Sequence, residues 1–278
     1  MQEQHYTAAP YLADSRAFLR ELGVDLRRAL TLSLTLFIRD FTARYRRTVL
    51  GYLWAVLPPI AMTLTFVFLR QRGVLDQGQQ AHAYVVTVLA GVTFWQFFAD
   101  AVSQPVRSVQ QYKTVIAKAR FPYEAILLSG IYQVMFDGLV RFLLLGAAMA
   151  VYQLGGLQSV IPALLGGIAL CGVGTILGVL LSPLSTLFDD VEKGLSLALF
   201  FWFLLTPSVY ATTNETTNWW LLNPVAPLIE WARDGLLITE QFSLFPQVLV
   251  ALPLAVALGA TWILFRLGIS HAIQGLGQ

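Results

Sequence analysis

Long apolar segments separated by short polar ones dominate the chain. A bilayer core of about 30 Å needs about 20 consecutive apolar residues of α-helix. Six segments meet this requirement: roughly 51–69, 84–102, 125–151, 159–182, 195–211 and 246–267. The fifth is short at its outer end, where Thr206-Pro207 interrupts it. The pattern predicts an all-α, polytopic membrane protein with six transmembrane helices.

In the segment before the first span, apolar residues alternate with charged ones at the spacing of an amphipathic helix. From residue 24 onward, leucine, phenylalanine and tyrosine recur every three or four positions, and arginines occupy much of the remainder. This spacing gives a helix with one apolar and one cationic face, which suits the membrane interface. Packing on a soluble domain is the alternative, which the membrane span that follows directly makes less attractive. We expect a cytosolic tail over 1–23, an amphipathic interface helix over 24–50 and a transmembrane domain over 51–268.

One apolar stretch before the last span is too polar and too broken to cross a membrane. The segment 214–238 contains Asn223-Pro224 and Pro227, and it carries Glu230, Arg233 and Asp234. Proline prevents one continuous helix, and backbone ends at membrane depth need protein or a wet cavity around them. We therefore expect two short re-entrant helices here, with Trp219, Trp220, Asn223 and Pro224 at the outer mouth of a hydrated channel.

Composition and charge support the membrane assignment and give its orientation. The chain is 56% hydrophobic and 12% charged, against roughly 25% charged in soluble domains. Cations gather in the tail and interface helix, in the second connection and near the C-terminus. Between the spans on the opposite side only Arg70, Arg72 and Arg233 occur. The positive-inside rule then places both termini, including a tail over 269–278, in the cytoplasm.

No enzyme site stands out in the sequence. It has no Gly-x-x-x-x-Gly-Lys-Ser/Thr phosphate loop, no His-Glu-x-x-His and no Gly-x-Ser-x-Gly motif. Its three histidines are scattered, and its single cysteine, Cys171, lies in an apolar run. We expect no catalytic, cofactor-binding or metal-binding residues. A membrane glycosyltransferase is the rival enzyme hypothesis, and Asp189, Asp190 and Glu192 form the acidic cluster it would need.

Two further features carry candidate functional residues. The connection 105–122 between the second and third spans combines apolar residues at helical spacing with four cations, so it either rests on lipid headgroups or docks on a cytosolic partner. In the third span, Asp137 and Arg141 lie one helical turn apart. We expect these two to form an intramembrane ion pair with a structural role; a role in translocation is the alternative.

Several motifs, in order, resemble those of one transporter family. The run Arg44-Tyr45-Arg46-Arg47-Thr48-Val49-Leu50-Gly51-Tyr52-Leu53-Trp54 to Pro59 resembles the opening signature of permease subunits of type 2 ABC exporters for O-antigen and capsular polysaccharides. Gly91 to Phe98, Ala117 to Pro122, Thr206 to Tyr210 and Leu222-Asn223-Pro224 agree with later family motifs. The similarity covers about residues 35–268. One departure is Phe188-Asp189-Asp190, where family members usually have an Arg-Asp pair.

The resemblance implies partners and roles. Two copies of this chain would form the pore, and two copies of a separate cytosolic subunit would bind ATP and Mg and drive it. Segment 105–122 would be the coupling helix, segment 24–50 the interface helix and segment 214–238 the outer gate. The substrate would be a glycan on a polyprenyl diphosphate carrier in a bacterial inner membrane, with no nucleic acid involved. The expected ATPase-coupling residues are Val109, Tyr112, Lys113, Ile116, Arg120 and Phe121.

Aromatic residues in the spans suit a glycan, whose apolar sugar faces stack on rings. The candidates for the channel wall are Trp95, Phe98, Phe201, Trp202 and Tyr210. Each ring could instead face lipid or anchor the chain at the interface, as aromatic residues commonly do. A permease of the same superfamily that exports a drug, a lipid or a teichoic-acid-like polymer is the alternative function.

Overall fold

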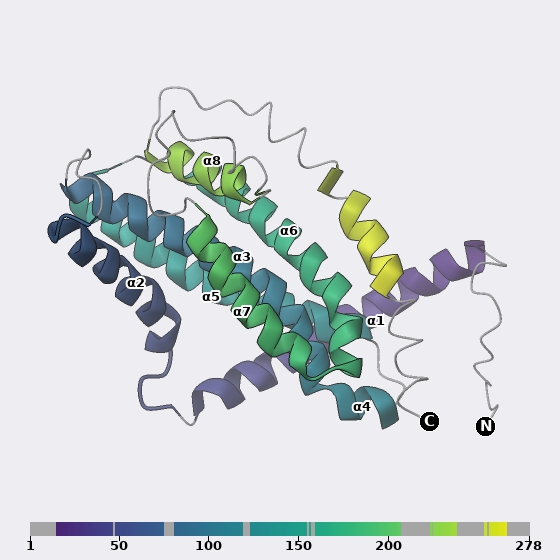
Figure 1. The fold of residues 1–278 in the computed structure, drawn as a ribbon. Helices are drawn as coiled ribbons and strands as arrows, with labels where there is room; N and C mark the ends of the chain where they lie inside the picture. Colours follow the sequence, from purple (N-terminus) through teal and green to yellow (C-terminus); the bar gives the residue numbers. More distant parts are fainter. Residues whose placement is uncertain are drawn as a thin grey trace.

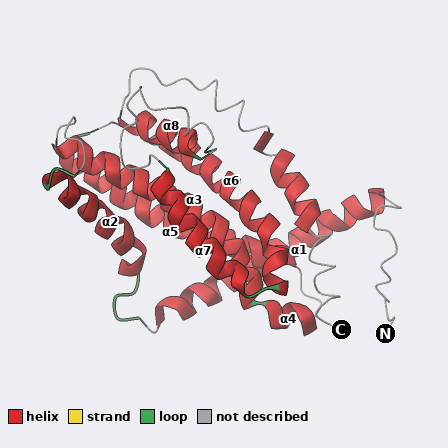
Figure 2. Ribbon diagram, viewed as in Figure 1, coloured by secondary structure: helices red, strands yellow, loops and turns green. Residues whose placement is uncertain are grey.

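The computed structural model describes residues 15–46, 48–74, 81–118, 123–154, 156, 159–206, 223, 225–237, 253–254 and 256–265. Within these ranges the chain is helical and contains no strand, which confirms the all-α fold (Figures 1 and 2). The helices are α1 (Ser15–Arg46), α2 (Leu53–Gln71), α3 (Ala81–Gln111), α4 (Lys113–Lys118), α5 (Tyr123–Tyr152), α6 (Val160–Leu187), α7 (Asp190–Leu205) and α8 (Ala226–Leu237).

Four of these helices are long and apolar enough to cross a membrane. They are Leu53–Gln71, Ala83–Gln111, Tyr123–Tyr152 and Val160–Leu187, and they correspond to the first four predicted spans. The fifth predicted span appears as α7, which has 16 residues. The sixth lies partly outside the described residues, and Val256–Phe265 within it is an apolar helix. The total of six therefore stays a prediction.

The helix α3 is the centre of the bundle and packs against α2, α5, α6, α7 and α8. Its side chains Val92, Phe94 and Phe98 are completely buried. The helix α6 comes close to the backbone of α3, since a β-carbon on Gly178 would lie 2.3 Å from the carbonyl oxygen of Val102. Small residues at such contacts let two membrane helices approach closely.

The helix α3 is also longer than the sequence predicts. The sequence predicts a second span over 84–102 and a separate connection from residue 105, but the helix runs through Pro105 to Gln111. A proline removes one intrahelical hydrogen bond without preventing continuation when neighbouring helices hold the segment. At 1.5 Å per residue, its 31 residues span about 46 Å, which exceeds the bilayer core. The first part of the predicted coupling segment 105–122 is thus the end of α3, and α4 is the separate helix.

The helices α1 and α2 meet at a sharp corner. The described part of α1 begins at Ser15, earlier than the predicted 24, and ends at Arg46 rather than at 50. Gly51 has a φ of +50°, a left-handed conformation that glycine adopts without strain. From there α2 rises along α3 and α5, while α1 crosses one end of the bundle near α4 (Figure 1).

The helix α8 covers the opposite end of α6 and also contacts α3. Ala226, Ile229 and Ala232 are completely buried. Pro227 lies in its first turn, where a missing N–H has no intrahelical acceptor. The other helix of the predicted re-entrant pair lies outside the described residues, so the pair itself stays a prediction.

Candidate functional site: the charged end of the bundle

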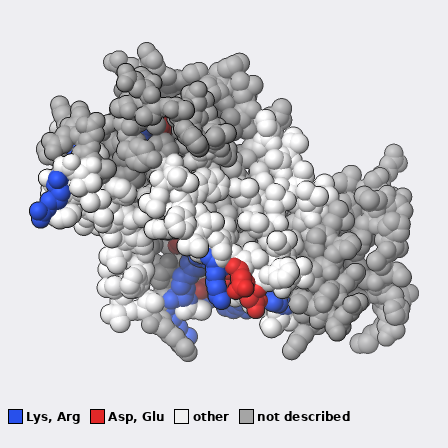
Figure 3. All heavy atoms as spheres, viewed as in Figure 1, with Lys and Arg blue, Asp and Glu red and all other residues white. Residues whose placement is uncertain are grey.

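The largest group of charged side chains among the described residues lies where α1, the last turns of α3, α4 and the start of α7 meet. We call this region the basic end. Figure 3 shows blue and red atoms side by side at this end, below a broad belt of uncharged surface, and a separate blue patch at the upper left. Its cations are Arg39, Arg44, Arg46, Arg107, Lys113 and Lys193, and its acids are Asp40, Asp189, Asp190 and Glu192. This is the end that the positive-inside rule assigns to the cytoplasm.

An apolar core fixes the elements of the basic end to one another. Val109, Tyr112 and Ile116 are at most 6% exposed and pack with α1, α5 and α6 side chains in one cluster. Their helical spacing therefore reflects packing within the chain. We correct the prediction that these three contact a partner, because their side chains are already covered. Lys113 is partly exposed, and Arg120 and Phe121 lie outside the described residues.

A polar triad joins α1 to the turn between α3 and α4. The Tyr112 hydroxyl donates to Asp40 Oδ2 at 2.5 Å, and the Arg39 guanidinium donates to the Tyr112 hydroxyl. Arg39 also donates to Asp40 Oδ1 at 2.9 Å. Burial, the Asp40 hydrogen bond and the Asp40 charge raise the pKa of Tyr112 to about 12, against the opposing effect of Arg39. Tyr112 therefore stays a neutral donor at physiological pH.

The raised pKa of Tyr112 predicts a loss of stability at alkaline pH. The unfolded phenol releases its proton near its ordinary pKa of 10, whereas the folded one holds it to about 12. Stability from this residue is thus complete below pH 10 and falls as the pH rises to about 12. We expect Tyr112→Phe to be less stable than the wild type at pH 8 and to lose less on going to pH 11.5. Thermal unfolding of the purified protein across this range measures the difference; parallel curves would contradict it.

The connection between α6 and α7 is tied to α3 and α4 by ion pairs. Asp189 Oδ1 accepts hydrogen bonds from Gln110 Nε2 at 2.7 Å and from Lys113 Nζ at 3.1 Å. Arg107 Nε lies 3.5 Å from Glu192 Oε1. The Gln110 and Lys113 contacts lower the pKa of Asp189, so its carboxylate is ionised. Asp189 is the residue at which the chain departs from the Arg-Asp pair. Sequence reasoning missed its partner because the two lie 76 residues apart.

The two intramembrane charges of α5 do not pair with each other, which corrects the prediction. Arg141 Nη1 lies 2.5 Å from Asp100 Oδ2 on α3, and Asp137 Oδ2 lies 3.4 Å from Arg44 Nη1 on α1. Gln133 donates to Asp137 Oδ1 at 3.0 Å. Asp137 and Arg141 are four residues apart and share one face of α5. Even so, Asp137 pairs with a residue of α1 and Arg141 with a residue of α3, and the two do not pair with each other. The spacing alone left both outcomes open.

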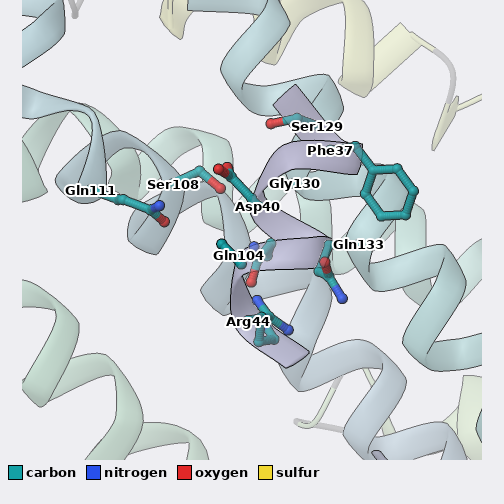
Figure 4. A pocket seen from close by; sticks show the side chains of 10 residues that line it. Phe37, Asp40, Arg44, Gln104, Ser108, Gln111, Ser129, Gly130 and Gln133 are labelled. Carbon is teal, nitrogen blue, oxygen red and sulfur yellow. The ribbon is translucent and has the colours of Figure 1, made fainter. Parts of the chain in front are cut away.

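A polar cavity lies between α1, α3 and α5, and Asp40 of the triad is part of its wall. Its volume is about 210 Å³, and Figure 4 shows polar side chains from all three helices converging on it. Its lining consists of Phe37, Asp40, Ala43, Arg44, Gln104, Ser108, Gln111, Ser129, Gly130 and Gln133. A β-carbon on Gly130 would lie 2.8 Å from Ser108 Oγ, so glycine lets the α3 wall of the cavity approach α5.

The predicted channel aromatics divide into two groups. Trp95 and Phe98 are 4% and 0% exposed, and both rings contact Trp202 within one aromatic cluster. We therefore assign Trp95 and Phe98 to the core rather than to a channel wall. Phe201 is 55% exposed on α7, and Trp202 is partly buried. Tyr210 lies outside the described residues.

One residue of the predicted outer gate is described, and it links α7 to α8. The Asn223 side chain accepts from Trp202 Nε1 at 3.0 Å and from the Val225 amide at 3.1 Å. It also donates to Thr206 Oγ1 at 2.8 Å. Asn223 thus joins the end of α7 to the first residues before α8. The predicted gate residues Trp219, Trp220 and Pro224 lie outside the described residues.

The acidic cluster has basic partners rather than a metal-binding arrangement. Asp189 pairs with Lys113, Asp190 with Lys193 and Glu192 with Arg107. Among the described residues no three His, Cys, Asp or Glu side chains come together as metal ligands. This arrangement gives no support to the glycosyltransferase alternative.

Comparison with known proteins identifies the family. The model of the ABC-2 type transporter family matches residues 31–237. An O-antigen export system permease protein RfbA of Klebsiella pneumoniae is 30% identical over 206 residues, which cover 70% of this chain and 76% of that protein. The RfbA permease of Myxococcus xanthus is 25% identical over 183 residues, covering 64% of this chain and 68% of that protein. The helical bundle, its apolar spans and these matches together show that the chain belongs to the ABC-2 type transporter family and is a transport permease.

Proposed function

We propose that the chain is the channel-forming subunit of an ATP-driven exporter that moves a polyprenyl-diphosphate-linked polysaccharide across a bacterial inner membrane. The observation that carries the proposal is its similarity, over most of its length, to permeases named for O-antigen export. Two copies would form the pore, and both termini would lie in the cytoplasm. ATP hydrolysis would take place on two copies of a separate subunit.

The basic end fits a surface that receives motion from such a subunit. The triad ties the α3–α4 turn to α1, the Lys113–Asp189 pair ties α4 to the residue before α7, and the Arg107–Glu192 pair ties α3 to α7. A displacement of α4 by a partner would therefore be transmitted to α1, α3 and α7. The exposed side chains there include Arg107, Gln111 and Thr114 on α3 and α4, which a cytosolic partner could contact.

The exposed aromatic face of α7 supports a glycan as the transported molecule. Phe200 and Phe201 are 54% and 55% exposed, with their rings 5.7 Å apart. Aromatic rings bind sugars through their apolar faces and need no charge to do so. A second copy packed beside α7 would bring two such faces to one channel.

Contact with the ATPase is tested by a pair of matched substitutions. Thr114 is exposed at the basic end, and Thr65 is exposed on α2 away from it. We expect Thr114→Trp to reduce co-purification of the ATPase and surface glycan at least tenfold while the permease remains in the membrane. Thr65→Trp should leave both unchanged, since it adds the same side chain on a surface that the ATPase does not reach.

The substrate is tested in cells that lack this gene. We expect lipid-linked glycan to accumulate on the cytoplasmic side, and a plasmid copy of the gene to restore it to the surface. Normal surface glycan combined with increased sensitivity to an apolar drug would contradict the glycan assignment and favour the drug-exporting alternative.

A further inference from the structure

The first span contains two adjacent prolines inside a continuous helix. In an α-helix the Ala55 carbonyl accepts from the N–H of residue 59, and in a 3₁₀ turn from that of residue 58. Both positions are proline, Pro58 and Pro59, and proline has no N–H. The Ala55 carbonyl therefore has neither of its ordinary helical donors.

Arg141 supplies a donor to this carbonyl from the neighbouring helix. Its Nε lies 3.2 Å from the Ala55 oxygen. Ala55 is 6% exposed and Arg141 is 8% exposed, so water has little access to the contact. An unsatisfied carbonyl costs several kcal/mol at membrane depth. The hydrogen bond thus meets a need that the two prolines create.

Asp100 holds the donor in place. The other arm of the guanidinium, Nη1, lies 2.5 Å from Asp100 Oδ2 on α3. A planar guanidinium can point two donors in fixed directions, which a lysine ammonium cannot reproduce. The carboxylate also compensates the positive charge. One side chain of α5 therefore joins α2 and α3.

The contact lies on the face by which α2 packs. The buried residues of α2 are Ala55, Pro59 and Thr63, spaced four apart, and Thr63 Oγ1 donates to the Pro59 carbonyl at 2.7 Å. On the other side of the α1–α2 corner, Asp137 pairs with Arg44. The helix α5 thus holds α1 and α2 on both sides of the corner, one turn apart.

We propose that Arg141 is a positioning residue for transport: it caps the carbonyl freed by Pro58 and Pro59 and so fixes the proline-containing start of α2 against α5 and α3. Its role in export rests on the proposed function, whereas the capping itself is independent of the substrate. Without the cap, the start of α2 would keep its prolines and lose this hydrogen bond to α5.

The test removes the Arg141 side chain in two backgrounds: one in which Pro59 leaves the Ala55 carbonyl without a helical donor, and one in which alanine at position 59 supplies that donor. Arg141→Met is always combined with Asp100→Asn, so that neither charge is left without its partner. We expect this double change to lower the Tm of the detergent-solubilised permease by several degrees, because the Ala55 carbonyl loses its donor. In a Pro59→Ala background, which restores an N–H in α-helical register with that carbonyl, the same double change should lower the Tm by less than half as much.

Pro58→Ala is the matched control. It adds an N–H in α-helical register with the carbonyl of residue 54 and only in 3₁₀ register with that of Ala55, so it should rescue less than Pro59→Ala. An equal effect of the double change Arg141→Met with Asp100→Asn in all three proline backgrounds would overturn the proposal. A larger rescue by Pro58→Ala than by Pro59→Ala would also overturn it, because only residue 59 is in α-helical register with the Ala55 carbonyl.

Surface glycan is then measured for the same variants. A positioning role is supported if adding Pro59→Ala partly restores the export lost with Arg141→Met. It is also supported if Arg141→Lys, made in the otherwise wild-type chain, exports as little glycan as Arg141→Met. Restored Tm without any restored export would overturn that role. The Tm measurements use no substrate, so their result does not depend on the proposed function. If the proposed function is wrong, cells that carry the wild-type chain will export no glycan.

Discussion

Gly178→Ala should destabilise the bundle by about 3 kcal/mol, at the upper end of what overpacking in a core usually costs. The new β-carbon would lie 2.3 Å from the Val102 carbonyl oxygen and 3.0 Å from Pro105 Cγ. A backbone carbonyl cannot turn aside as a side chain can, so α3 and α6 must separate. These two helices share the most extensive contact in the described bundle, and the cost therefore falls on the whole fold.

Gly146→Ala is the control for this experiment. A β-carbon on Gly146, in the middle of α5, would have no neighbour within 4 Å. Alanine favours a helix over glycine by up to about 1 kcal/mol, so this variant should be as stable as the wild type or slightly more so. Denaturant or thermal unfolding in detergent compares the two. A Gly178→Ala protein as stable as Gly146→Ala would mean that α3 and α6 lie further apart than described.

The lengths and polarity of the helices could be predicted from the sequence. Apolar runs long enough for a bilayer gave the first four spans, and the arginine-rich repeat before them gave α1. The boundaries moved where tertiary packing outweighed local preference. Pro105 disfavours a helix locally, but α3 continues through it because α5 and α6 hold the segment on both sides.

Partner choice at the candidate site could not be predicted from spacing. Tyr112 and Ile116 have the pattern of a docking stripe, yet an apolar stripe is satisfied equally by another protein or by the rest of the same chain. Here α1 and α5 cover it. Only the positions of distant helices decide between these outcomes, and a local pattern contains no information about them.

The same limit applied to the aromatic residues. Trp95 and Phe98 suit a sugar and suit a core equally well, because a large ring gains free energy from burial in either place. Their position on the central helix α3 buries them, whereas Phe201 on the outer helix α7 remains exposed. One signal could have been used: Pro58-Pro59 leaves a carbonyl without a donor, which predicts a polar side chain from another span.

The choice of partners by Arg141 predicts a large and specific coupling. Arg141→Gln alone should cost about 3–5 kcal/mol, the usual cost of breaking a buried ion pair, because Asp100 keeps its charge at 32% exposure of its side chain. Adding Asp100→Asn should recover much of this loss. Recovery should be incomplete, since the Ala55 carbonyl still lacks its donor, at a cost of about 1–3 kcal/mol.

Asp137→Asn is the comparison that separates the two pairings. The direct partners of Asp137 are Arg44 and Gln133, so its coupling to Arg141 should be smaller than that of Asp100, which contacts the guanidinium directly. Two double-mutant cycles on the purified permease, one for residues 100 and 141 and one for 137 and 141, measure both coupling energies. A larger coupling for 137 and 141 would restore the pairing within α5. A larger coupling for 100 and 141 would show that this charge joins α5 to α3 in the membrane.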